Sequence, residues 1–100
     1  MSKSIMQNVR ECYVCGTTLD LHRHHCIYGT GNRKKAEEDG LWVYLCVRHH
    51  VENKTGVHGG NKALNEELHR DAQRAFEAKF GHEAYMERYR LNWLEEWEWL

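Results

Sequence analysis

Two short motifs of cysteine and histidine constrain the fold of this chain more than any other feature of its sequence. Cys12 and Cys15 are separated by two residues, and Cys46 and His49 repeat that spacing later in the chain. A C-x2-[CH] spacing places two soft ligands on one tight turn around a tetrahedral zinc ion, and four such ligands complete a closed structural site. We therefore expect these four residues to hold a structural Zn²⁺.

The length of the chain makes such a metal staple useful for folding. A chain of 100 residues is one domain at most, and a core of that size is only marginally stabilising. Two disulfides are the alternative use of four cysteines, but a cytosolic location disfavours them and Cys26 has no obvious partner. We interpret Cys26 as a small buried apolar side chain, with a further metal ligand as the alternative.

The expected location is the cytosol. The first residues lack the apolar stretch of a secretory signal, and no apolar run approaches membrane-spanning length. The formal net charge of -1 argues against a protein that coats nucleic acid by bulk electrostatics. The charge is uneven, however, because residues 1–62 hold nine Lys and Arg against six Asp and Glu, whereas residues 63–100 hold five against nine. We expect a polyanion to meet the first half of the chain.

The hydrophobic pattern and the turn residues predict an α+β fold. The expected elements are strands at 21–28 and 41–45, a basic loop at 29–35, a helical turn at 36–39, a short helix at 47–54, a loop at 55–60, and helices at 61–80 and 82–100. We therefore predict a single domain over residues 1–100, with a zinc-stapled core at about 10–60 and a helical extension at 61–100.

Histidines give the second chemical signal. Six of the eight lie within a window of 37 residues: His22, His24, His25, His49, His50 and His58. Neighbouring residues point to opposite faces of a strand and diverge by about 100° on a helix, so each adjacent pair must divide between two tasks.

If His49 closes the zinc site, its neighbour His50 points elsewhere. His24 from the strand and His58 from the following loop are plausible companions of His50 in a second metal site. Such a site has few protein ligands, so water or a phosphate can fill its open positions, as a catalytic metal requires. His25 is then left beside the metal with a free imidazole.

That arrangement suits phosphodiester hydrolysis. His25 would remove a proton from the attacking water near neutral pH, and the metal would stabilise charge on the phosphate and the leaving oxygen. The basic loop at Arg33, Lys34 and Lys35 could hold flanking phosphates. Arg23 could contact phosphate as well, or it could simply cover the sheet.

The segments HHCI (24–27), LWVYLC (41–46) and CVRHH (46–50), preceded by a Cys-x2-Cys motif, resemble an HNH (ββα-metal) endonuclease with an added zinc knuckle. More narrowly, the basic segment after the first histidine pair, GLWVYL (40–45) and VHG (57–59) resemble small bacteriophage proteins of the Ref-like family of RecA-dependent nucleases. The resemblance covers residues from about 10 to about 90.

The resemblance implies roles for particular residues. In HNH enzymes the first histidine of the strand pair (His24) and the histidine after the last knuckle ligand (His50) bind the catalytic metal, while the second of the pair (His25) is the general base. His58 would be a further ligand on the narrower resemblance. A divalent ion such as Mg²⁺ or Mn²⁺, a DNA substrate, a RecA-type filament as partner, and the cytoplasm of a bacterial host are implied in the same way.

The chain departs from the common HNH pattern at one position. HNH proteins usually carry an asparagine five residues before the second knuckle cysteine, where this chain has Leu41. The sequence offers Asn32, Asn53 and Asn61 as substitutes and does not choose among them.

Other residues have simpler interpretations. His22 is either a spare ligand or a solvent-facing residue, and His69 and His82 are expected on helix surfaces. An aromatic stripe on the last predicted helix is interpreted as packing, or as a surface for a partner or a homodimer; it comprises Tyr85, Tyr89, Trp93, Trp97 and Leu100.

Two functions follow from these observations. The favoured one is a metal-dependent DNA endonuclease with a single catalytic metal, encoded by a phage and associated with recombination. The alternative is a zinc module without catalytic activity that acts as an adaptor for DNA or protein.

Overall fold

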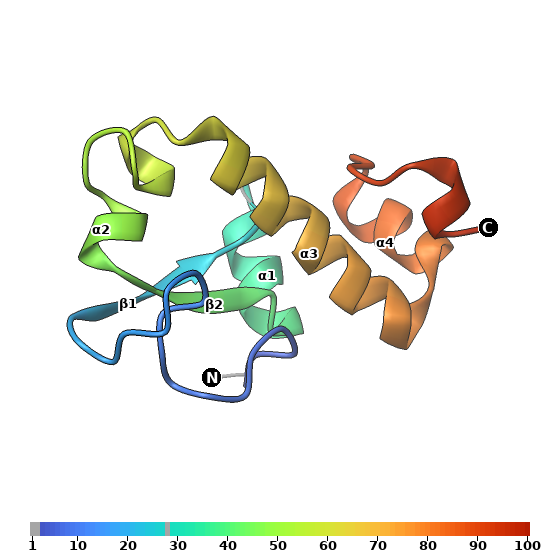
Figure 1. Ribbon diagram of the computed structural model, residues 1–100. Coiled ribbons are helices and arrows are strands. Elements are labelled where there is room, and N and C mark those ends of the chain that lie inside the picture. Colours follow the sequence, from blue (N-terminus) through green and yellow to red (C-terminus); the bar gives the residue numbers. More distant parts are fainter. Residues whose placement is uncertain (1–2, 28) are drawn as a thin grey trace.

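A two-stranded antiparallel sheet joins the segments that carry the cysteines and histidines (Figure 1). The computed structural model describes residues 3–27 and 29–100. Strand β1 spans Leu21–His25 and strand β2 spans Trp42–Cys46, so both strand predictions are confirmed at their centres. The expected β1 is longer, and its last predicted residue, Tyr28, lies outside the described residues. The sheet and the helices around it confirm the α+β class.

The register of the sheet decides which side chains share a face. Residues paired directly across an antiparallel sheet lie on the same face, and neighbours along a strand alternate between faces. The pairs are Leu21 with Cys46, His22 with Leu45, Arg23 with Tyr44, His24 with Val43, and His25 with Trp42. His24 therefore lies on the face of buried Val43 and Leu45, whereas His25 lies on the opposite face with Trp42.

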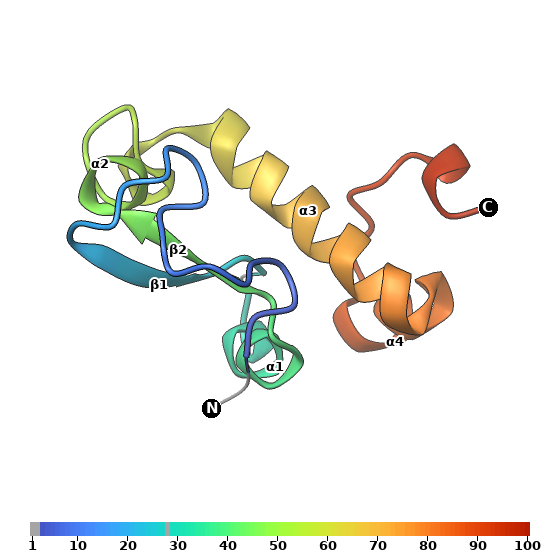
Figure 2. The same cartoon turned by 60° about the horizontal axis from the view of Figure 1, so that its bottom comes forward.

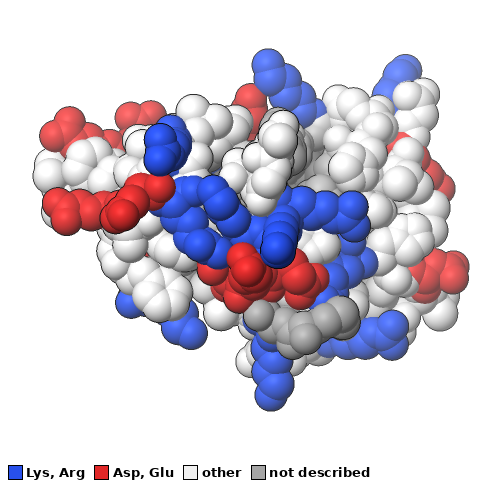
Figure 3. All heavy atoms as spheres, turned by 180° about the vertical axis from the view of Figure 1, so that it is seen from behind, with Lys and Arg blue, Asp and Glu red and all other residues white. Residues whose placement is uncertain are grey.

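Helix α1, Asn32–Asp39, connects the two strands and corrects the prediction of a basic loop at 29–35. Only Ala36 of this helix is buried, so the segment lacks the apolar periodicity from which a helix is predicted. Its acidic second half is held by one distant cation instead, since Arg88 pairs with both Glu38 and Asp39. Figure 3 shows basic side chains gathered around a small acidic group on the side of the molecule that faces away in Figure 1.

Two short elements follow β2. Helix α2 spans Val47–His50 and is shorter than the predicted helix at 47–54. The predicted loop at 55–60 contains a short 3-10 helix, η1, at Val57–Gly59. The loop between them is held by its own backbone hydrogen bonds, including Lys54 N–H to the carbonyl of Gly59. These elements bring His50 and His58 close to the sheet.

Helix α3, Lys62–Phe80, confirms the helix predicted at 61–80. Asn61 caps it, because its side-chain oxygen accepts a hydrogen bond from the backbone N–H of Leu64. The apolar residues Leu68, Ala72 and Phe76 recur at steps of four residues and are buried in the core. Figure 1 shows α3 running from the end that holds α2 to the end that holds α4.

Helix α4, His82–Tyr89, ends well before the predicted end at residue 100. The chain leaves the helix at Arg90, which adopts a left-handed conformation, and folds back along α3. Buried Gln73 of α3 accounts for this turn, since its side chain bonds to the side chain of Asn92 and to the backbone N–H of Trp93. The second bond satisfies a backbone N–H that a continued helix would have satisfied internally.

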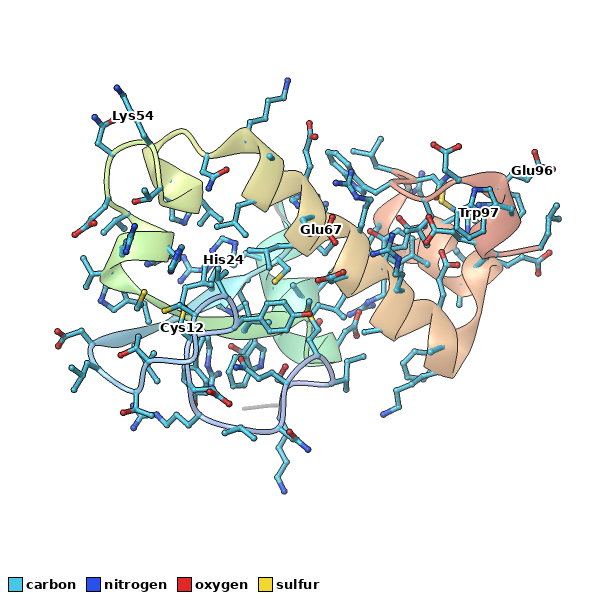
Figure 4. The ribbon with its side chains drawn as sticks, viewed as in Figure 1. Cys12, His24, Lys54, Glu67, Glu96 and Trp97 are labelled. Carbon is cyan, nitrogen blue, oxygen red and sulfur yellow. The ribbon has the colours of Figure 1, made fainter. Side chains whose placement is uncertain are left out.

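The last residues therefore do not form one aromatic helix. A 3-10 helix, η2, spans Glu96–Glu98, and Trp99 stacks on the ring of His82. Tyr85 and Tyr89 are buried, whereas Trp97 is 77% exposed, so the predicted stripe is split between core and surface (Figure 4). A homodimer through this region stays a prediction, but a continuous helical stripe cannot mediate it. In the described part of the chain, no helix is both long and apolar enough to cross a membrane.

The N-terminal segment packs against the end of α1 and lies beside the sheet (Figure 2). Gly40 makes this approach possible, because its φ of 74° is left-handed and a Cβ there would lie 2.4 Å from the backbone oxygen of Lys3. The carbonyl of Gly40 also accepts a hydrogen bond of 2.9 Å from the N–H of Ile5. Gly40 thus fixes the position of residues 3–5 relative to the sheet.

We expect Gly40→Ala to lower the free energy of unfolding by about 1–3 kcal/mol more than Gly31→Ala does. Gly31 also has a left-handed φ, of 82°, and stands at the other end of α1. Among the described residues other than its chain neighbours, however, no atom lies within 4 Å of its Cβ position. The two variants share the backbone strain, and only the first adds the clash. Denaturant unfolding at equal zinc content measures the difference, and equal losses would contradict the close approach.

Candidate metal centres and histidine cleft

The four predicted zinc ligands come together in the structure. Cys12 and Cys15 lie in the turn before β1, Cys46 ends β2, and His49 lies on α2. Their ligand atoms all lie within 4.8 Å of one another, and all four cysteines of the chain are free rather than disulfide-bonded. This Cys3His cluster could hold a metal ion such as zinc.

The distances between the ligand atoms match a tetrahedral zinc site. The Sγ atoms of Cys15 and Cys46 are 3.8 Å apart, and Nδ1 of His49 lies 3.3 Å from Sγ of Cys46 and 3.8 Å from Sγ of Cys12. Zinc–sulfur bonds of about 2.3 Å place the corners of a tetrahedron about 3.8 Å apart, and zinc–nitrogen bonds give a slightly shorter edge. These three distances fit a Zn²⁺ ion, and the other distances between the ligand atoms are at most 4.8 Å.

Backbone groups prepare one sulfur for metal binding. Burial alone would raise the pKa of Cys12, but hydrogen bonds from the backbone of Cys46, Cys15 and Val14 lower it to about 6. A thiolate is the form of cysteine that binds metal. Next to Cys12, the hydroxyl of Tyr13 donates a hydrogen bond of 3.0 Å to the carboxylate of Asp71, which ties the cysteine turn to α3.

A second group of potential ligands consists of histidines alone. His24 of β1, His50 at the end of α2 and His58 of η1 have ring nitrogens that all lie within 4.8 Å of one another. Their ring centroids are 4.8–5.5 Å apart in edge-on arrangements. Figure 4 shows His24 reaching from the sheet towards α2. The structure thus brings together the three residues predicted for the second metal site.

One ring nitrogen of His24 lacks a partner in the described part of the chain. Its side chain is 5% exposed, and its Nε2 makes no hydrogen bond to any described residue. A buried polar atom without a partner is costly, and a metal ion would remove that cost. Burial, followed by the neighbouring His50 and His58 rings, lowers the pKa of His24 to about 3. The ring is therefore neutral at pH 7, as metal binding requires.

His22 also belongs to this group of rings. Its Nδ1 lies 2.9 Å from Nδ1 of His50, so one of the two nitrogens donates a hydrogen bond to the other. His22 is exposed, in line with one of the two interpretations made from the sequence, but it contacts a member of the histidine cluster. Burial and the charges of His58 and His22 lower the pKa of His50 to about 4.

His25 lies on the other face of the sheet and is held by an acidic residue that the sequence reading missed. Nε2 of His25 is 2.9 Å from Oε1 of Glu37 on α1. The same carboxylate accepts hydrogen bonds of 2.9 and 3.1 Å from Arg23. Burial raises the pKa of Glu37, but the hydrogen bonds from His25 and Arg23 outweigh it and keep the pKa below its ordinary value. Since an ionised carboxylate can only accept, Nε2 of His25 carries the hydrogen of this contact.

Both faces meet in one cleft, named here the histidine cleft. It has a volume of about 270 Å³ and is lined by Arg23, His24, His25, Ile27, Arg33, His50 and His58. Two of the four basic residues predicted to hold DNA, Arg23 and Arg33, therefore border the cleft. Lys34 is exposed on α1, and Lys35 turns away, because its ammonium group donates to the backbone oxygen of Arg88.

Of the asparagine candidates, Asn61 has contacts that bear on the histidine cluster. The side chain of Asn61 accepts from Leu64 N–H and donates to the carbonyl of Thr55, at 3.1 Å each. It thereby fastens the loop that carries His58 to the start of α3. Leu41, at the position where HNH proteins usually have asparagine, is fully buried in the core. Cys26 is also fully buried, and burial raises the pKa of its thiol, in agreement with an apolar role.

The expectation that His69 and His82 lie on helix surfaces is wrong for His69. Its side chain is buried because Trp93 of the returning tail packs against it, with ring centroids 4.4 Å apart. His82 is half-buried between Glu77, to which its Nδ1 bonds at 2.8 Å, and Trp99. Both residues serve the packing of the tail.

The chain was compared with protein-family models, curated proteins and solved structures, and none of them matches. The candidate function therefore depends on the geometry of these residues.

Proposed function

We propose that the chain is a metal-dependent DNA endonuclease of the HNH type. The Cys3His cluster would hold a structural zinc ion, and His24, His50 and His58 would hold a catalytic divalent ion. Of Mg²⁺ and Mn²⁺, which the resemblance implies, Mn²⁺ accepts imidazole ligands more readily. The observation that carries the proposal is the histidine cleft itself. His24, His50 and His58 line this cleft, and among the described residues the buried Nε2 of His24 has no partner. His25, which is held by the carboxylate of Glu37, lines the same cleft.

The three-histidine group suits a catalytic metal better than a structural one. Structural zinc sites are closed by four protein ligands, whereas catalytic sites keep positions open for water or substrate. His58 is exposed and His50 is half-buried, so the group opens towards solvent on that side. A bound divalent ion would stabilise negative charge on the phosphate and on the leaving oxygen.

His25 supplies the general base in this proposal. Its Nδ1 takes a proton from a water molecule as the oxygen of that water bonds to phosphorus, and the bond from phosphorus to the leaving sugar oxygen breaks. Glu37 acts as a positioning residue, because its bond to Nε2 fixes both the orientation of the ring and the tautomer. Its negative charge also stabilises the imidazolium that forms.

Arg33 is the residue that we expect to hold a phosphate next to the cleaved bond. It is exposed on the first turn of α1 and borders the histidine cleft. A guanidinium binds phosphate oxygens with two parallel hydrogen bonds. A requirement for a RecA-type filament is part of the proposal only through the resemblance to Ref-like nucleases.

The experiment that tests the proposal measures cleavage of supercoiled plasmid and of single-stranded circular DNA by the wild-type protein. Each substrate is incubated without added metal and with Mg²⁺ or Mn²⁺, in the presence and absence of a RecA filament. The proposal predicts nicking that requires the added metal. Absence of cleavage under every one of these conditions, in protein that contains one zinc per chain, would favour the adaptor.

A further inference from the structure

The face of the sheet that carries His25 continues into a second cleft, named here the aromatic cleft. Arg23 and Tyr44 are paired across the strands on this face, and Trp42 is paired with His25. The N-terminal segment forms the opposite wall, where Ser4 donates to the backbone oxygen of Trp42 and Gln7 accepts from the N–H of Tyr44. The cleft is therefore built from both strands and from a segment that Gly40 holds in place.

The aromatic cleft combines flat rings with positive charge. Cζ of Arg23 lies 3.7 Å from the centroid of the Trp42 ring, and Cζ of Arg10 lies 5.5 Å from that of Tyr44. The two rings contact each other edge to face, with centroids 5.1 Å apart. Trp42 is buried beneath Arg23, which presents a supported guanidinium plane, while Tyr44 is only half-buried.

The size and the lining of the cleft fit a nucleotide. Its volume is about 510 Å³, within the range of about 300–1,000 Å³ for pockets that bind small ligands. Lys3, Arg10 and Arg23 line it, and among the described residues no Asp or Glu does. Arg23 also borders the histidine cleft, so the two clefts meet at this residue.

We propose that the aromatic cleft binds unpaired nucleotides of a DNA strand that continues from the histidine cleft, which makes single-stranded DNA the substrate class. Bases stack on tyrosine rings and on arginine planes only when they are unpaired, because in a duplex their faces are covered by neighbouring bases. Lys3 and Arg10 would follow the phosphates of the same strand, since the charge of Arg23 is already paired with Glu37. This inference rests on the proposed nuclease function for the path of the strand from the histidine cleft. The binding that it predicts can be measured without any cleavage reaction.

Fluorescence anisotropy without added divalent metal tests the inference. The probes are a short fluorescein-labelled oligothymidylate and a labelled duplex of the same length. We expect the wild type to bind the single strand at least about 5-fold more tightly than the duplex, and Tyr44→Leu and Arg10→Ala each to weaken that binding by about 5-fold or more.

Arg70→Ala provides the matched control for charge. Arg70 lies on α3, pairs with Glu67 and lines neither cleft, so its loss should change affinity by less than about 2-fold. Zinc content and the unfolding midpoint are measured for each variant, so that a loss of fold is recognised. Arg10 is exposed, so its replacement should leave the fold intact.

Three outcomes would overturn the inference: no binding of the single strand by the wild type, equal or tighter binding of the duplex, or full affinity in both Tyr44→Leu and Arg10→Ala. Each of these leaves the nuclease proposal standing if metal-dependent cleavage is observed. If both variants lose affinity as expected but the wild type cleaves no DNA, the result supports nucleotide binding in the aromatic cleft and contradicts the nuclease proposal.

Discussion

Cys46→Ser is expected to abolish zinc binding and to lower the free energy of unfolding by more than about 4 kcal/mol, a large share of the 5–15 kcal/mol available to a small domain. Cys46 is a cluster ligand and also the last residue of β2, so its loss frees the cysteine turn, β2 and α2 at once. Zinc per chain, measured by elemental analysis, and denaturant unfolding of the same samples test this expectation.

Cys26→Ala serves as the control for that experiment. Cys26 is fully buried but outside the metal cluster, so its replacement leaves a small cavity and keeps the zinc ion. We expect a loss of about 1 kcal/mol with zinc still near one per chain. A Cys46→Ser protein that retains one zinc ion would contradict the Cys3His site.

His25→Ala is expected to lower the rate of DNA cleavage by about 10²- to 10⁴-fold, the usual contribution of a general base. The fold and the zinc content should not change, since His25 contributes one hydrogen bond to Glu37 and lies outside both ligand groups. Initial rates of plasmid nicking at saturating Mn²⁺ provide the measurement.

His82→Ala is the matched control for the loss of an imidazole. His82 is likewise paired with a glutamate, Glu77, but at the opposite end of the molecule. Its replacement should leave nicking within about 2-fold of the wild type, at a cost in stability of about 1 kcal/mol. Cleavage by His25→Ala at the wild-type rate would remove His25 from the role of base.

The local parts of the site could be predicted from sequence because they depend on local geometry. The C-x2-[CH] spacing is enough to predict the Cys3His cluster, and the alternation of a strand is enough to separate His24 from His25. The rotation of about 100° per residue on a helix separates His49 from His50 in the same way. The structure brings each of these residues to the expected cluster or face.

The parts that could not be predicted depend on contacts between distant segments. Glu37 was missed because α1 is polar and gives no periodic signal, and its pairing with His25 appears only when the helix is packed beside β1. The end of α4 was missed because no glycine or proline marks it, and Gln73 of α3 holds the returning tail instead. Burial of His69 follows from that tail.

The dependence of the nicking rate on Mn²⁺ concentration, compared between wild type and His58→Ala, tests most directly whether the histidine cluster supports catalysis. His58 is exposed, so its removal takes away one ligand without disturbing the core. We predict saturable activation of the wild type and a half-saturating Mn²⁺ concentration at least about 10-fold higher in the variant, with one structural zinc per chain in both. Nicking that needs no added metal, or the same Mn²⁺ dependence in both proteins, would contradict a catalytic metal at this cluster.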